Sequence, residues 1–174
     1  MIDMNTANVP LKNAGLLLVH PFLNNLFKYL DYLDDKNQFK NEVTVWRAVY
    51  VMHYIATGQV GATDEADLAM SKLLSGMPIG AAIPLDLTLS SNEIDYTNEV
   101  LQVIISRWDK LGKASNDGLR NTFLTRNGIV EEHNEAFNLS IETSGTDILL
   151  DFLPWNITVV KLPWIKNIIY SSWR

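Results

Sequence analysis

The spacing of apolar residues changes along the chain and divides it into a helical part and a strand-rich part. In the first two thirds, apolar positions recur every three or four residues, as on an amphipathic helix. Beyond Asn127 and Gly128 they alternate with polar positions, as in a strand. We therefore expect an α+β fold, mainly α-helical over its N-terminal two thirds, with a C-terminal β-hairpin and a β-rich tail.

The helical part contains five expected helices and an extended connection. The segment from Glu42 to Thr57 carries apolar residues all around its axis, which predicts a buried central helix that ends at Gly58. Ser90 and Glu93 have the spacing of a capping box, so a helix should begin there and run up to Gly112. The other segments are a short strand or turn at Leu16–Val19, helices at about Phe22–Leu33 and Asp64–Leu74, an extended crossing loop at Met77–Leu89 and a short helix from about Ser115.

The last third of the chain predicts strands. Ile129 and Val130 can pair with the alternating run Phe137–Ile141 across a polar turn at His133–Glu135. Thr146–Leu153 should form one or two helical turns, and two strand-like runs follow at Ile157–Leu162 and Ile168–Trp173. We expect residues 1–12 to be a flexible N-terminal segment and residues 13–174 to be a single globular domain.

Composition excludes several classes of partner. The 174 residues are 47% hydrophobic and carry a net charge of −6, so no general field attracts nucleic acid or anionic lipid. No apolar run approaches the roughly 18 to 20 residues that span a bilayer. The chain has no cysteine, which removes disulfides, thiolate zinc sites and cysteine nucleophiles.

No residue pattern indicates catalysis. His20, His53 and His133 lack the spacing of a zinc site, and neither a Gly-rich phosphate loop nor a Gly-x-Ser-x-Gly elbow occurs. We expect no catalytic residue, no cofactor and no metal, and the chain should not be an enzyme.

The last twenty residues form the one locally basic and aromatic stretch. Three tryptophans spaced by nine stand there with basic residues and no acid, and this pairing of residue types is typical of interface hot spots. The predicted protein interface comprises Trp155, Trp164, Trp173, Lys161 and Lys166. The alternative is that these tryptophans cap the core around the turns at Pro154 and Pro163.

A short helix followed by a hairpin also resembles a winged-helix ending. In such a DNA-binding regulator, Arg120 and Arg126 would contact phosphates or bases. Against this alternative, the first hairpin strand carries Glu131 and Glu132, and the chain is acidic overall.

Several short motifs, in this order, resemble a known family. They are Asn13-Ala-Gly-Leu-Leu-Leu-Val-His-Pro-Phe-Leu23, His53-Tyr-Ile-Ala-Thr-Gly58, Lys72-Leu-Leu-Ser-Gly-Met-Pro78, Gly118-Leu-Arg120 with Phe123-Leu124, Leu149-Leu-Asp151, Leu153-Pro-Trp155 and Leu162-Pro-Trp164. Together they are similar to the C-terminal region of the tape measure proteins of extracellular contractile injection systems. The resemblance runs from about Asn13 to Trp173.

The resemblance implies a structural assembly role in a phage-tail-like particle. Such proteins lie in the inner tube during assembly and help set its length, so the expected partners are the inner tube, the baseplate hub or copies of the chain itself, as a homo-oligomer. The chain would be cytoplasmic during assembly and then inside or attached to the particle. A ruler extends by about 1.5 Å per helical residue, whereas these helices are short and interrupted by Gly and Pro. We therefore expect an anchoring domain and not the ruler itself.

Overall fold

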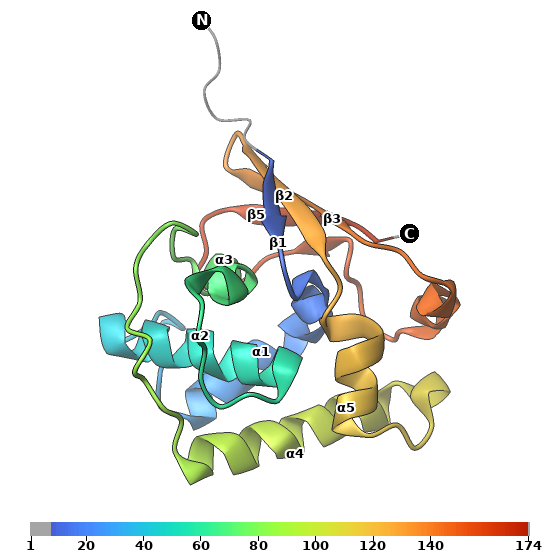
Figure 1. The fold of residues 1–174 in the computed structure, drawn as a ribbon, viewed down its shortest axis with the longest axis horizontal. Coiled ribbons are helices and arrows are strands. Elements are labelled where there is room, and N and C mark those ends of the chain that lie inside the picture. The colour runs from blue at the N-terminus through green and yellow to red at the C-terminus, as the bar shows by residue number, and fades with distance from the viewer. Residues whose placement is uncertain (1–7, 174) are drawn as a thin grey trace, which may run out of the picture.

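The computed structural model describes residues 8–173, in which a helical layer packs against one face of a mixed five-stranded sheet (Figure 1). The helical segments are η1 (Ala14–Val19), α1 (His20–Tyr29), α2 (Glu42–Thr57), η2 (Glu65–Leu68), α3 (Ala69–Ser75), α4 (Ser91–Arg107), η3 (Asp109–Leu111), α5 (Asn116–Leu119), the π-helix η4 (Arg120–Leu124) and η5 (Gly145–Phe152). The strands are β1 (Val9–Leu11), β2 (Gly128–His133), β3 (Ala136–Ile141), β4 (Val159–Val160) and β5 (Ile168–Ser172). The expected α+β class, with helices first and strands last, is confirmed.

The central helix α2 has the predicted bounds. Its N-terminus is closed by a capping box in which Asn41 and Thr44 satisfy each other's backbone N–H groups. Gly58 ends the helix in the left-handed conformation, with φ of 72°, where glycine has no steric penalty. Residues 48–56 of α2 are all buried, so the prediction of a helix surrounded by protein is confirmed.

Helix α4 begins at the predicted capping box but ends earlier than expected. The Glu93 backbone N–H donates to Ser90 Oγ at 3.3 Å, and the Glu93 carboxylate accepts from the Ser90 N–H at 2.9 Å. The helix stops at Arg107 because Trp108 turns inward, fully buried, and donates its indole N–H to the Leu149 carbonyl at 3.1 Å. The 3-10 turn η3 carries the chain on to Gly112.

The Glu93 carboxylate also joins α4 to the rest of the helical layer. It accepts hydrogen bonds from the Tyr32 hydroxyl and from the Arg47 guanidinium, whose Nε lies 2.9 Å away. Burial by itself would raise the pKa of Glu93, but the hydrogen bonds from Arg47, Tyr32 and Ser90 outweigh it and lower that pKa to about 2. The carboxylate is therefore held in its charged form.

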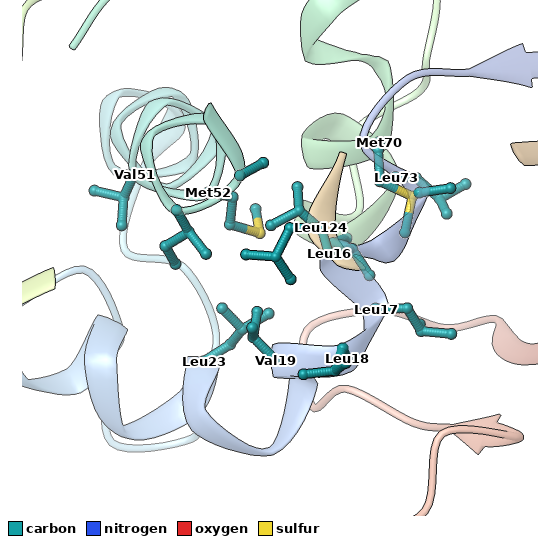
Figure 2. Close-up of a cluster of buried hydrophobic side chains, with 14 of the residues drawn as sticks. Leu16, Leu17, Leu18, Val19, Leu23, Val51, Met52, Met70, Leu73 and Leu124 are labelled. Atoms are coloured by element: carbon teal, nitrogen blue, oxygen red, sulfur yellow. The ribbon is translucent and has the colours of Figure 1, made fainter. Parts of the chain in front are cut away.

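The apolar run at Leu16–Val19 is a 3-10 helix, so the expected strand or turn is wrong. All six residues of η1 are buried, and side chains from α2, α3 and η4 gather around them (Figure 2). His20 and Pro21 do not break the chain here but begin α1, since proline is compatible with the first helical turn. A β-carbon added at Gly15 would lie 1.7 Å from the Phe123 carbonyl oxygen, which shows how closely η1 approaches η4.

The sheet order is β1-β2-β3-β5-β4, and all pairs are antiparallel except β3 with β5. The predicted hairpin is confirmed: β2 pairs with β3, with Ile129 opposite Ser140 and Val130 opposite Leu139. Strand β1 corrects the expectation of a flexible N-terminal segment for residues 9–11, and residues 1–7 of that segment lie outside the described residues. One face of the sheet is buried against the helices and includes Val130, Leu139, Ile141, Val160 and Ile169. The other face is open and carries Ile129, Val159, Ile168 and Tyr170.

The crossing loop between α3 and α4 contains neither helix nor strand, as expected. Lys72 holds this loop, because its buried ammonium group donates to the Ala81 carbonyl at 2.7 Å. Glu65 accepts from the Ile83 backbone N–H at 2.8 Å, so the loop has polar attachments as well as apolar ones.

Candidate protein-interaction site

Trp155 joins the C-terminal segment to the start of α1. Its indole N–H donates to the Leu18 carbonyl at 2.8 Å, and its ring meets the Phe22 ring edge-on at 5.1 Å between centroids. The neighbouring Asn156 carbonyl lies 2.7 Å from His20 Nε2, and burial lowers the pKa of that histidine. The indole N–H is thus hydrogen-bonded within the domain, while part of the half-buried ring is exposed to solvent.

Trp164 makes an equivalent attachment to the end of α3. Its indole N–H donates to the Leu74 carbonyl at 2.8 Å, and its ring packs against Phe27 and Phe39 at 5.5 and 5.3 Å. Gln38 donates to the preceding Pro163 carbonyl at 2.8 Å, which fixes the turn. The Trp164 side chain is half-buried.

Trp173 lies in the core. Its exposed fraction is 3%, and its ring contacts Phe123 at 6.5 Å between centroids. It follows strand β5, which carries the side chain under the sheet towards η4. Within the described chain, this indole supports the packing of sheet on helices.

The two lysines of the predicted interface both have partners within the domain. Lys161 donates to the Ile165 carbonyl at 2.7 Å and closes the turn around Trp164. Lys166 pairs with Glu135 at the hairpin tip, and this ion pair holds the pKa of the glutamate below its usual value. Because the Lys166 pair is exposed, it contributes little stability and can exchange for a partner's carboxylate. The interface assignment of these five residues stays a prediction, with the open parts of Trp155, Trp164 and Lys166 as its accessible atoms.

Arg120 is a buried residue that closes the C-terminal end of α2. Its guanidinium donates to the Ile55 and Tyr54 carbonyls at 3.1 and 3.2 Å and to Asp117 at 3.0 Å. A β-carbon at Gly58 would lie 3.2 Å from the same guanidinium, so the glycine leaves the room that the arginine fills. Arg120 therefore supplies a donor to the Ile55 carbonyl, which the end of the helix leaves without a backbone partner, and a second donor to the Tyr54 carbonyl, which also accepts from the Gly58 N–H.

Arg126 is likewise turned inward. It donates to the Glu142 carbonyl at 2.9 Å and forms a two-pronged ion pair with Asp147, with one N–O distance of 2.8 Å. Both arginines that a winged-helix protein would present to DNA are thus engaged within the domain. The structure gives no support to the DNA-binding alternative.

The three histidines lie apart. His20 is at the start of α1, His53 is buried in α2 and His133 is exposed at the hairpin turn. Among residues 8–173, no group of three or more histidine, aspartate and glutamate side chains could hold a metal ion. Within the same residues, every helix is too short or too polar to cross a membrane.

The sequence motifs meet in pairs, which the sequence did not reveal. Trp155 of the first Leu-Pro-Trp motif contacts Leu18 and Phe22, and Trp164 of the second contacts Leu74 in the Lys72–Pro78 segment. Arg120, from the Gly-Leu-Arg motif, contacts the end of the His53–Gly58 segment. These pairings join segments that are far apart in the chain, so the motif residues stabilise the fold.

An open groove of about 460 Å³ lies where the Asn13–Leu23 motif meets the Leu153–Trp155 motif, and it is lined by Pro21, Phe22, Asn25, Arg107, Pro154 and Trp155. The sequence predicted Trp155 as an interface residue and gave no prediction for Arg107. Arg107 lies in the last turn of the observed α4, where a basic residue is commonplace, but the predicted helix ran on to Gly112, so no sequence signal distinguished Arg107.

Comparisons with curated proteins and with solved structures find no match. A family model described as contractile injection system tape measure protein matches residues 3–173, nearly the whole chain. This match confirms the resemblance drawn from the motifs, and it points to a structural, non-enzymatic role with protein partners. The chain belongs to the family of contractile injection system tape measure proteins.

Proposed function

We propose that this chain is an anchoring domain, which fixes a tape measure protein to another component of the injection system during assembly. A tape measure protein belongs inside the particle, so its anchoring partners are proteins: the inner tube, the baseplate hub or further copies of the chain.

The observation that carries the proposal is the length of the helices. The longest helix among residues 8–173 is α4, whose 17 residues extend about 25 Å. Residues 9–11 pair with a hairpin from the last third of the chain, so segments far apart in the sequence close into one folded unit. A folded unit of this kind suits attachment better than measurement of a long tube.

The first test is removal of residues 8–173 from the parent gene in an organism that makes the particle. We expect tubes to fail to assemble, or to vary in length, because the ruler has lost one point of attachment. Electron microscopy of purified particles gives the tube lengths directly. Tubes of normal number and length would contradict the proposal.

The second test locates the contact surface. A photo-crosslinking amino acid at Lys166, which is exposed beside the half-buried Trp164, should yield a crosslink to a tube or hub protein identified by mass spectrometry. The matched control is the exposed Asp95 on α4, where no crosslink is expected. Equal crosslinking from both positions would refute the predicted C-terminal interface.

A further inference from the structure

The groove between the start of α1 and the end of α4 combines aromatic walls with a single charge. Phe22 and Trp155 meet at an interplanar angle of 76°, and Pro21 and Pro154 extend the apolar lining. The indole N–H of Trp155 is already bound to the Leu18 carbonyl, so these walls offer carbon surface and no free donor.

Arg107 supplies the charge. Its guanidinium carbon lies 5.9 Å from the centroid of the Phe22 ring, within the range of a cation–π contact. Arg107 is exposed, and no carboxylate in residues 8–173 lies within ion-pair distance of it, whereas Arg47, Arg120 and Arg126 each pair with an acidic side chain. Among the groove-lining side chains there is this one cation and no anion.

The chain carries a net charge of −6, so the positive charge at Arg107 is a local exception on an acidic protein. An acidic partner is repelled by most of the surface and attracted where an arginine stands without an anion. A guanidinium over an aromatic ring presents a planar set of donors that fits a carboxylate, and such charge-assisted pairs are the strong ones.

From these contacts we infer that the groove binds a segment of a partner protein in which an aspartate or glutamate stands next to a proline or a bulky aliphatic residue. The carboxylate pairs with Arg107, and the apolar residue fills the angle between Phe22 and Trp155. The inference rests on the proposed anchoring function and names the chemistry of the segment that the domain holds.

Peptide titration of the full chain, followed by nuclear magnetic resonance, tests the recognition itself. The probe is a short peptide with an Asp-Pro-Leu core, acetylated and amidated so that it has no terminal charges, and the comparison is its Asn-Pro-Leu analogue. We expect the first peptide to shift the indole N–H signal of Trp155 and the side-chain amide of Asn25. The analogue should bind about tenfold more weakly, because it loses a charged hydrogen bond.

Variants assign this effect to one side chain. Arg107→Glu should weaken binding of the aspartate peptide at least about tenfold and favour an analogue with lysine in place of aspartate. Lys113→Glu makes the same charge change at an exposed position outside the groove and should leave binding unchanged. Absence of shifts at millimolar peptide, equal binding of the two peptides, or shifts that arise from self-association without peptide would each overturn the inference.

The same variants in the assembled particle separate the groove from the anchoring role. Arg107→Glu should reduce the amount of chain retained in purified particles, and Lys113→Glu should not. If Arg107→Glu is retained normally while removal of residues 8–173 prevents assembly, the groove assignment is wrong and the anchoring function stands. If that removal leaves assembly intact, the anchoring function itself fails.

Discussion

Replacement of Arg120 by methionine tests whether the arginine is a structural residue or a nucleic-acid contact. Methionine keeps most of the apolar stem but removes the donors to the Ile55 and Tyr54 carbonyls. The Tyr54 carbonyl keeps one hydrogen bond, because the Gly58 N–H donates to it at 2.8 Å, so its loss amounts to about 1 kcal/mol. The Ile55 carbonyl is left without this donor in a buried position, which costs about 2 kcal/mol.

The pair with Asp117 adds little, because the aspartate side chain is 79% exposed. We therefore expect Arg120→Met to lower the free energy of unfolding by about 3 kcal/mol, or the melting temperature by roughly 6–12 °C. Urea unfolding monitored by tryptophan fluorescence measures the first quantity, and calorimetry measures the second.

Asp117→Asn is the matched control, since it removes only the exposed partner and should change stability by less than about 0.5 kcal/mol. A methionine variant within that same range of the wild type would refute the assignment of Arg120 to the end of α2. A variant that is as stable as wild type but loses affinity for duplex DNA would revive the winged-helix alternative.

Three further predictions use other parts of the structure. Glu93→Gln should destabilise the domain by about 3 kcal/mol at neutral pH, since it leaves Arg47 without its buried partner. Because the pKa of Glu93 falls from 4.5 to about 2 on folding, wild-type stability should decline as the pH drops through that interval, and the variant should show less decline in acid unfolding curves. Gly15→Ala should prevent folding, at a cost above about 4 kcal/mol, whereas Gly145→Ala, which meets no atom within 4 Å, should be neutral; circular dichroism of the two proteins decides. The purified domain should not shift duplex DNA in a gel at low salt, and a salt-sensitive shift at micromolar protein would contradict this.

The local sequence pattern was sufficient to predict those helices and strands whose capping residues or turns lie within or directly beside them. Helix α2 has an apolar surface all around and a glycine at its end, and α4 has the Ser90 and Glu93 capping box, so both were predictable. The β2–β3 hairpin alternates in polarity around a polar turn. In each of these cases the residues that define the element lie within or beside it.

Elements defined by distant partners were not predictable. Four successive apolar residues from Leu16 to Val19 suit a buried strand as well as a buried helix, and packing by α2, α3 and η4 decided in favour of a 3-10 helix. Strand β1 has three residues, one of them proline, and exists through its pairing with β2. The parallel pairing of β3 with β5 has no sequence signature of its own.

The same reasoning explains the outcome for the candidate site. The contact surface expected from tryptophans beside lysines stays a prediction, and the acceptors of the Trp155 and Trp164 indoles are main-chain carbonyls, which no sequence pattern reveals. Arg120 and Arg126 also bind carbonyls, so basic residues near a hairpin gave a misleading suggestion of DNA contacts. The groove is lined by residues of α1 and α4 and by residues 154 and 155, and these segments approach one another only in the folded chain.

The attachment of Trp155 and Trp164 to the Leu18 and Leu74 carbonyls has a consequence for the order of events during synthesis. The segments around Leu18 and Leu74 cannot complete their packing until Trp155 and Trp164 have been made, since the partners lie 137 and 90 residues apart. Contacts of such long range slow folding and leave the early apolar segments in need of protection. A ribosome that stops before Trp155 therefore yields an unfinished domain with an uncovered interior, which chaperones and proteases can distinguish from the finished one before either reaches a growing tube.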